Sequence, residues 1–297
     1  MQDRTSNSNI DPLTASTGAK IAFQGELGAY SHAACREVFP QLDPLPCTSF
    51  EAALEAVKTR DADLAMMPIE NSIYGRVADL HHLLPTSGLY VIAEHFLKVE
   101  LDLLALPGVK LSDIREAQSF SVALGQCKRF LAENGIVPVN GPDTAGSARL
   151  VAEAGERARA AIASRLAGEI YGLEPVATCI EDADHNTTRF LVMSRRRIEA
   201  DPTDTVPALT SFVFEVRNVP AALYKALGGF ATNGVNMVKL ESYMKNGLFT
   251  ATEFYAEIEG HPAHPEVERA MDELRFFCKS LTILGVFAAH PYRKVSS

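Results

Sequence analysis

Residues 212–216 read Phe-Val-Phe-Glu-Val, a short apolar run of the kind that forms a buried strand. Pro220 follows this run closely, and proline is favoured in the first turn of a helix, so we expect a helix from Pro220 to about Thr232. Asn233-Gly234 then marks the end of that helix. The C-terminal third of the chain therefore opens with a strand followed by a helix.

The remaining C-terminal segments continue this alternation. The alternating residues 235–242 predict a second strand, and Asn246-Gly247 is a hairpin signal that leads into a third strand over 249–258. Residues 265–279 have helical spacing, and 281–287 read as a final strand. The order β-α-β-β-α-β is that of the ferredoxin-like unit, which predicts this fold for residues 207–297.

Upstream of this unit, short apolar runs alternate with helical stretches, which is typical of an α/β domain with a mostly parallel sheet. About 180 residues is large for one such sheet, so we expect two lobes with a cleft between them. We expect strands at 21–23 and 64–67, a strand that begins near Arg189, and helices at 31–38, 50–59, 119–134, 145–154 and 159–171; the segment 90–106 between them is rich in Leu and Val.

The chain divides where its composition changes. Residues 195–207 are charged, contain two prolines and have little apolar content, which predicts a boundary between domains. We therefore expect a catalytic region over 20–200 and a separate unit over 207–297. Residues 1–19 are polar and aperiodic at their start, and we expect them to form a flexible tail.

Charge and cysteine content exclude several classes of protein. The chain of 297 residues has a formal net charge of −9, which argues against the clustered basic face of a nucleic-acid-binding protein. The five cysteines are scattered, without the spacing of a zinc site or a disulfide framework. No run has the length of a membrane span and no secretion signal is found, so we expect a cytoplasmic protein that does not bind membranes.

Two polar clusters follow expected strands in the first lobe. Gly25, Gly28 and Ser31 predict a nest of backbone amides at a helix start, which would bind a carboxylate or phosphate; the alternative is an ordinary helix cap by Ser31. Glu70-Asn71-Ser72 comes directly after a buried strand, where open α/β sheets bind ligands. A polar turn that caps the next helix is the alternative there.

Two further clusters come later. Ser119 and Gln126 are separated by nearly two helical turns, which places both on one helix face; a cap and a solvated side chain explain them equally well. Thr188 and Arg189 are adjacent at the start of a strand, so they point to opposite faces unless the strand begins after Thr188. One of the two is otherwise structural, and an ion pair of Arg189 with Asp182 or Asp184 is an alternative to ligand binding.

Taken in order, these clusters resemble the motifs of the prephenate dehydratase family along nearly the whole chain. The matching stretches are Gly-x-x-Gly-x-Tyr-Ser (25–31), Pro-Ile-Glu-Asn-Ser (68–72), Ala-Leu-x-Gln-Cys (123–127), Asp-Thr-Ala (143–145), Ala-Ile-Ala-Ser (161–164) and Thr-Arg-Phe (188–190). The resemblance implies two α/β lobes similar to periplasmic binding proteins, with the site in a cleft. It also implies the loss of carbon dioxide and the ring hydroxyl from prephenate to give phenylpyruvate, without a metal or organic cofactor.

The same resemblance implies roles for individual residues. Thr188 is implied to assist departure of the ring hydroxyl, and Arg189 with backbone amides is expected to hold the pyruvyl carboxylate. The residues implied to bind substrate are Ser31, Glu70, Asn71, Ser72, Ser119, Gln126, Thr144, Arg189 and Phe190. One wall departs from the family pattern, because Ser119-Phe120-Ser121 stands where Ser-His-Pro is frequent.

The C-terminal unit resembles an ACT domain, a module that binds amino-acid effectors. The resemblance implies L-phenylalanine as effector, bound by Ala221, Ala222, Leu223, Tyr224, Asn236, Glu241 and Ser242, and it implies a homodimer or homotetramer. Ala221 replaces a glycine, and Tyr243-Met244 replaces Arg-Pro, so both effector motifs are altered. Two other functions stay open: an arogenate dehydratase, which performs the same chemistry on the amino-acid analogue, and a non-catalytic protein that binds or senses a small molecule.

Overall fold

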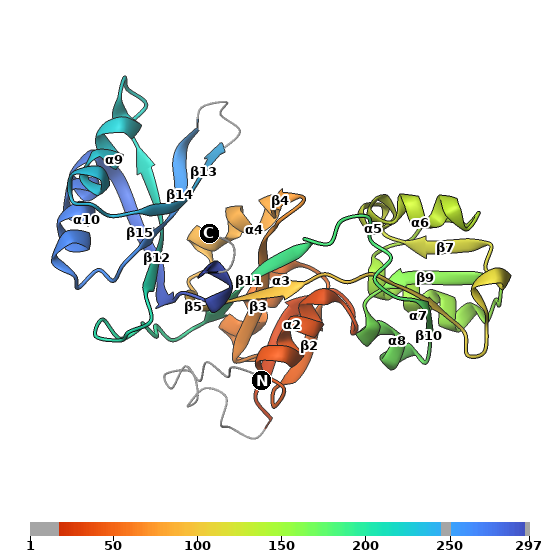
Figure 1. The fold of residues 1–297 in the computed structure, drawn as a ribbon. Helices are drawn as coiled ribbons and strands as arrows, with labels where there is room; N and C mark the ends of the chain where they lie inside the picture. Colours follow the sequence, from red (N-terminus) through yellow and green to blue (C-terminus); the bar gives the residue numbers. More distant parts are fainter. Residues whose placement is uncertain (1–17, 245–250, 295–297) are drawn as a thin grey trace.

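The computed structural model describes residues 18–244 and 251–294, and its strands form three sheets that lie in a row (Figure 1). The predicted tail, apart from Gly18 and Ala19, and the predicted turn Asn246-Gly247 lie outside the described residues. Ala19 is buried in the core of the first lobe, so it is not part of a loose tail.

The first lobe is built on a six-stranded sheet in the order β2-β1-β3-β11-β5, with β4 paired to β3. Strand β1 is parallel to β2 and β3, whereas β11 is antiparallel to both β3 and β5, so the sheet is mixed rather than mostly parallel. Its strands are β1 (Lys20–Gln24), β2 (Asp43–Cys47), β3 (Leu64–Asn71), β4 (Gly75–Arg76), β5 (Tyr90–Lys98) and β11 (Thr187–Ser194). Its helices are α2 (Tyr30–Val38), α3 (Phe50–Thr59), α4 (Ala78–Leu83) and the short η1 (Leu84–Thr86).

The second lobe has a five-stranded sheet in the order β10-β6-β9-β7-β8. Its strands are β6 (Asp102–Ala105), β7 (Glu116–Ser119), β8 (Val137–Asn140), β9 (Arg159–Ala163) and β10 (Glu174–Ala177). Its helices are η2 (Leu111–Asp113), α5 (Ser121–Gln126), α6 (Lys128–Glu133), α7 (Thr144–Ala154) and α8 (Arg165–Tyr171). The chain passes between the lobes twice, from β5 to β6 and from β10 back to β11, as Figure 1 shows.

Two predicted helices of the second lobe are wrong. The helix expected over 119–134 is two helices, α5 and α6, because the backbone of Cys127 leaves the helical region at φ −118° and ψ 20°. The helix expected over 159–171 is strand β9 followed by α8. The run Arg-Ala-Ala-Ile-Ala in β9 is buried from its second residue on, and a fully buried strand has no polar alternation that distinguishes it from a helix.

The third sheet forms the C-terminal unit, in the antiparallel order β13-β14-β12-β15. Its elements are β12 (Ala208–Val216), α9 (Ala222–Thr232), β13 (Met237–Met244), β14 (Ala251–Glu259), α10 (Pro265–Phe277), β15 (Cys278–Ala288) and the short η3 (Pro291–Lys294). This β-α-β-β-α-β order is the predicted one. Both helices pack on one face of the sheet, around Phe212, Phe214 and Phe230.

The other face of the C-terminal sheet packs directly on the first lobe. One hydrophobic core contains Met67 and Leu191 of the first lobe together with Leu209, Tyr255 and Phe287 of the C-terminal unit. Because burial of apolar surface is the main driving force of folding, a shared core predicts that the two units are held together firmly. Strand β15 also lies against strand β5.

Gly285 on β15 provides a test of this packing. A Cβ atom at Gly285 would lie 1.9 Å from the carbonyl oxygen of Val91 on β5, and a backbone atom has little room to yield. We expect Gly285→Ala to lower the free energy of unfolding by about 1–3 kcal/mol, measured by urea denaturation. Gly228→Ala in α9 is the matched control, since its Cβ would meet nothing within 4 Å. An equal response of both variants would contradict the close packing of β15 on β5.

Candidate functional site

Thr188 and Asn71 form a hydrogen-bonded pair where strands β11 and β3 lie side by side. Strand β11 begins at Thr187, and Thr188 is the cross-strand partner of Asn71. Asn71 Nδ2 donates to Thr188 Oγ1 at 3.0 Å and to Asn186 Oδ1 at 2.7 Å. A hydroxyl that accepts a hydrogen bond still has a proton to donate, so the half-buried Thr188 can donate to a ligand oxygen.

The amide of Asn71 is itself fixed by the turn that follows β3. Its Oδ1 accepts hydrogen bonds from the backbone N–H groups of Ile73 at 2.9 Å and Tyr74 at 3.1 Å. These two bonds orient the amide, so its nitrogen necessarily points toward Thr188 and Asn186. Asn71 therefore acts both as a turn former and as the donor that positions the Thr188 hydroxyl.

Arg189 points to the opposite face of β11, and the prediction that it holds a substrate carboxylate is wrong for this structure. Its Nε donates to Glu94 at 2.7 Å, Nη1 to Glu70 at 2.9 Å and Nη2 to Glu257 at 2.8 Å. The residue is 2 % exposed. The strand starts before Thr188, so alternation gives Arg189 a structural role. Its partners are these three glutamates rather than Asp182 or Asp184.

Glu70 faces the same side as Arg189, away from Thr188, and its contact with substrate stays a prediction. Between Arg189 and Phe190 the pairing with β3 shifts from Glu70 to Pro68, so Ile69 is an extra residue in a β-bulge. A bulge changes the side to which the following side chain points. Glu70 consequently bonds to Arg189 and to Lys239 of β13, while Asn71 points to Thr188.

The surrounding charges favour the ionised forms of this buried cluster. Burial raises the pKa of Glu70, but the positive charges of Arg189 and Lys239 outweigh it and leave the pKa below its usual value. Burial likewise raises the pKa of Glu94, and Arg293 and Arg189 bring it below the usual value. Burial lowers the pKa of Arg189, but Glu257 and Glu94 raise it well above normal.

Three other residues that were predicted to contact substrate have structural roles in the part of the chain that the structure describes. Ser72 Oγ donates to the carbonyl oxygen of His185 at 2.7 Å and accepts from the N–H of Thr187 at 2.9 Å, which joins the two strand ends. Ser119 is fully buried and its Oγ donates to the carbonyl oxygen of Ile162 at 2.6 Å, so it is not a helix cap. Phe190 is 1 % exposed in the core of the first lobe.

The remaining predicted contacts lie at helix ends. Ser31 is the second residue of α2 and is not its cap, because the capping position is Ala29. Thr144 is the first residue of α7, after the cap Asp143, and Gln126 is the last residue of α5. Gln126 and Thr144 are half-buried and Ser31 is 8 % exposed. Their contact with substrate stays a prediction.

The loop that contains Gly25 and Gly28 docks onto the second lobe. Arg149 Nε donates to Glu26 at 2.8 Å, and Ser164 Oγ donates to the carbonyl oxygen of Gly28 at 2.5 Å. Gly28 has a φ of +91°, and a Cβ there would lie 2.7 Å from the Cα of Ala167 in α8. The N–H of Gly28 donates to His32 Nδ1 at 3.0 Å, so one amide of the predicted anion nest is already bonded.

Sequence reasoning missed Arg149, Lys239 and Glu257, which bond to predicted motifs from distant parts of the chain. Glu26 lies inside the Gly25–Ser31 motif, and an acidic residue there could have suggested a basic partner. No local pattern identifies which arginine it pairs with.

The predicted effector residues lie in two segments of the C-terminal unit. Ala221 is the N-cap of α9, Ala222 to Tyr224 form its first turn, and Tyr224 is 79 % exposed. Asn236 Nδ2 donates to Glu259 at 3.1 Å. Glu241 and Ser242 lie against the first lobe, because Arg76 Nη1 is 3.5 Å from Glu241 and donates to the Ser242 carbonyl oxygen at 3.0 Å.

Ala221 adopts a backbone conformation that favours glycine. Its φ is 61° and its ψ is 14°, in the left-handed region, which costs a residue with a Cβ about 1–2 kcal/mol. We expect Ala221→Gly to raise the free energy of unfolding by about 1 kcal/mol in urea denaturation. Ala222→Gly, at the first residue of the helix, is the control and is expected to lower it by no more than about 0.5–1 kcal/mol, the cost of glycine in a helix interior. A loss of stability in both variants would contradict the strain at Ala221.

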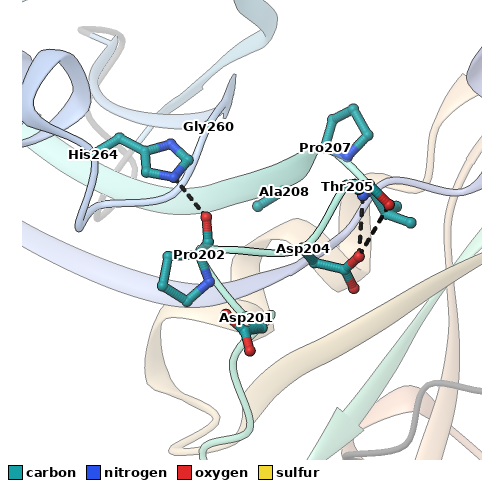
Figure 2. A pocket seen from close by; sticks show the side chains of 9 residues that line it. Asp201, Pro202, Asp204, Thr205, Pro207, Ala208, Gly260 and His264 are labelled. Carbon is teal, nitrogen blue, oxygen red and sulfur yellow. Dashed lines mark hydrogen bonds between the residues drawn. The ribbon is translucent and has the colours of Figure 1, made fainter.

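A cavity next to Asp201, on the segment that leads into β12, does not include Thr188 or Asn71 in its lining. It has a volume of about 190 Å³ and lies between the segment that links β11 of the first sheet to β12 of the third sheet and the loop after β14, as Figure 2 shows. His264 Nε2 lies 2.9 Å from the carbonyl oxygen of Pro202 (Figure 2). The lining residues are Asp201, Pro202, Asp204, Thr205, Val206, Pro207, Ala208, Gly260 and His264.

Within residues 18–244 and 251–294, no helix is both long and apolar enough to cross a membrane.

Comparison with known proteins places these features in one family. Residues 21–198 match the family model described as prephenate dehydratase. A relative from Komagataeibacter europaeus, a bifunctional N-acyl-homoserine lactone acylase/prephenate dehydratase, is 48 % identical over 274 residues, which cover 92 % of this chain and 97 % of the relative. The chloroplastic arogenate dehydratase/prephenate dehydratase 1 of Arabidopsis thaliana is 35 % identical, with 95 % of this chain and 75 % of that protein covered. The crystal structure of a prephenate dehydratase from Arthrobacter aurescens, in complex with L-Phe, is 31 % identical with a TM-score of 0.83 and covers 91 % of this chain and 90 % of its own.

Proposed function

Because the chain belongs to the prephenate dehydratase family, we propose that it converts prephenate to phenylpyruvate, carbon dioxide and water, with Thr188 as the group that assists departure of the ring hydroxyl. The hydrogen bond from Asn71 Nδ2 to Thr188 Oγ1 carries this proposal. The chemistry is that of a carbon–oxygen lyase, and the family implies neither a metal nor an organic cofactor.

The reaction needs one well-placed donor more than a strong acid. When the ring carboxylate leaves as carbon dioxide, the electron pair of the broken carbon–carbon bond moves into the ring and expels the ring oxygen as hydroxide. An alcohol is a weak acid near neutral pH, so Thr188 stabilises the departing oxygen mainly by hydrogen bonding. The bond that Thr188 accepts from Asn71 polarises its own O–H and strengthens it as a donor.

Contacts to the rest of the substrate remain proposals. Among the polar residues predicted to bind substrate, Ser31, Gln126 and Thr144 are those whose side chains have no hydrogen-bond partner within the described residues. With Arg189 committed to three glutamates, the carboxylates of the substrate need other donors. Backbone amides at the start of α2, which has no side-chain cap, are suited to anions. At the start of α7 the carboxylate of Asp143 already accepts from the N–H of Gly146.

Formation of phenylpyruvate from prephenate by the purified full chain tests the proposal. We expect saturable formation of phenylpyruvate, and no turnover above the uncatalysed rate would overturn it. Arogenate is assayed in parallel, because the 35 % identical relative carries both activities in its name. Faster turnover of arogenate would make the amino-acid analogue the physiological substrate.

A second candidate activity comes from the 48 % identical relative, whose name includes N-acyl-homoserine lactone acylase. The identity extends over nearly the full length of both chains, which favours the same two activities in this chain. Release of homoserine lactone from an N-acyl-homoserine lactone by the purified protein tests this candidate. An acylase rate unchanged in Thr188→Val would assign the two activities to different groups.

We further propose that L-phenylalanine regulates the enzyme at an ACT-like C-terminal unit. The β-α-β-β-α-β order of that unit and the 31 % identical relative crystallised with L-Phe support this. We also propose that the protein forms a homodimer or homotetramer and is located in the cytoplasm. The test is dehydratase activity against added L-phenylalanine, and no change in rate or in substrate affinity would reject the regulation.

A further inference from the structure

Six charged side chains form a cluster between the C-terminal sheet and the first lobe. We call it the interdomain charge cluster. Arg189 bonds to Glu70, Glu94 and Glu257, and Arg293 bonds to Glu94 at 2.7 Å and Glu257 at 3.2 Å. Lys239 completes the cluster through its bond to Glu70. It also lies 3.4 Å from Glu241, which pairs with Arg76 at the edge of the cluster. Within the cluster, three positive and three negative side chains balance each other, which makes its burial tolerable.

At the centre of this cluster, two cross-strand pairs face each other. Glu70 and Arg189 are partners on β3 and β11 of the first lobe. Lys239 and Glu257 are partners on β13 and β14 of the C-terminal unit. Each residue bonds to the one of opposite charge across the interface, Lys239 to Glu70 and Glu257 to Arg189. A shift of one sheet along the other would bring like charges together, so the cluster fixes how the two sheets are aligned.

The rung that bears Glu70 and Arg189 is next to the rung that bears Asn71 and Thr188. Asn71 is the last residue of β3, two residues after the extra residue Ile69 that interrupts the ladder with β11, and on its other side it pairs with Gly75 of the two-residue strand β4. The end of a strand beyond a bulge opens more readily than the middle of a regular ladder. Arg189 binds one oxygen of Glu70 and Lys239 binds the other, and both bonds hold this strand end in place.

We propose that Lys239, although it belongs to the C-terminal unit, is a positioning residue for the Thr188–Asn71 pair. It acts through Glu70, whose neighbour Asn71 must stay within hydrogen-bonding distance of Thr188. This inference rests on the proposed function, since it assigns a role in dehydration. Lys239 also links the C-terminal unit to the cross-strand pair of Asn71 and Thr188. It lies on β13, between Asn236 and Glu241 of the predicted effector residues.

Lys239→Met keeps most of the apolar stem of the side chain and removes only its charged end. Loss of positioning affects the transition state more than the binding of substrate, so we expect kcat to fall about tenfold while KM stays close to the wild-type value. Lys239→Arg restores a cation to Glu70 and is expected to recover most of kcat. If Lys239→Met does not fold, Lys239→Gln, which retains a hydrogen-bond donor without the charge, is assayed instead.

Lys279→Met is the matched control, because Lys279 forms a 3.0 Å ion pair with Glu215 on the same sheet. We expect its kcat and KM to equal those of the wild type. If Lys239→Met lowers kcat no more than Lys279→Met, or if Lys239→Arg recovers none of the loss, the positioning role is refuted.

Amide hydrogen exchange separates a failure of this inference from a failure of the proposed function. In Lys239→Met we expect faster exchange in residues 69–72 and 186–190, with unchanged exchange in strand β9 of the second lobe. A wild-type protein that does not convert prephenate would refute the proposed function, while the exchange data still decide whether Lys239 orders the strand end. Unchanged exchange in both segments would overturn the inference.

Discussion

Thr188→Val is expected to lower the rate of phenylpyruvate formation by about 100- to 10,000-fold, the range that a positioned proton donor contributes. Valine has nearly the same shape as threonine but cannot donate to the departing oxygen. Asn71 Nδ2 also loses one of its two acceptors and keeps Asn186 Oδ1. We expect the loss mainly in kcat, because the hydrogen bond strengthens as the oxygen gains charge in the transition state.

Thr187→Val is the control for this substitution. Thr187 is the preceding residue on β11, and its Oγ1 lies 3.2 Å from the hydroxyl of Tyr292 on the face opposite to Asn71. We expect its kcat to remain close to that of the wild type. Equal losses at both positions would mean that the strand, and not the Thr188 hydroxyl, is what the substitutions disturb.

Arg189→Met is expected to lower the free energy of unfolding by about 3–5 kcal/mol, the cost of removing one partner from a buried ion pair. The side chains of Glu94 and Glu257 are 0 % exposed and would lose a cation each. Guanidinium chloride denaturation at neutral pH measures the loss. The size of this effect reflects uncompensated negative charge in the interior more than the value of the bonds themselves.

The loss in Arg189→Met is expected to depend on pH. In the wild type the pKa values of Glu70 and Glu94 are lowered in the folded state, so these groups contribute stability above their unfolded pKa and lose it as the pH falls. In the variant, carboxylates without their cation take up protons more readily, which relieves the penalty in acid. The difference between the two proteins should therefore be larger at pH 8 than at pH 5.

Arg197→Met is the control for Arg189→Met. Arg197 pairs with Glu199 at the surface, where its side chain is 56 % exposed, and such pairs contribute about 0–1 kcal/mol. A loss of the same small size in Arg189→Met would contradict a buried role for the interdomain charge cluster.

The C-terminal unit was predictable because local signals agree with its tertiary structure. Pro220, Asn233-Gly234 and the alternating strands each mark an element boundary, and the structure has the expected order of elements. The first two sheets were less predictable. Strand β11 returns to the first lobe antiparallel to β3 after the entire second lobe, and no residue within it indicates its partner or direction. The alanine-rich strand β9 has the composition of a helix.

The site was predictable where strand alternation alone decides it. Alternation separates Thr188 from Arg189, and the structure places them on opposite faces. The direction of Glu70 depends on the bulge at Ile69, which arises from pairing with a strand distant in the sequence. The roles of Ser72 and Ser119 likewise depend on the carbonyl groups of His185 and Ile162, which only the folded chain brings close.

We propose that the hydroxyl of Thr188, and not its bulk, assists departure of the ring oxygen. The most direct measurement compares kcat for phenylpyruvate formation at saturating prephenate in Thr188→Ser and Thr188→Val. Serine keeps the hydroxyl and loses the methyl group, whereas valine does the reverse. We predict that Thr188→Ser retains activity within about tenfold of the wild type while Thr188→Val loses at least about 100-fold. A serine variant as inactive as the valine variant, or a valine variant as active as the wild type, would contradict the account.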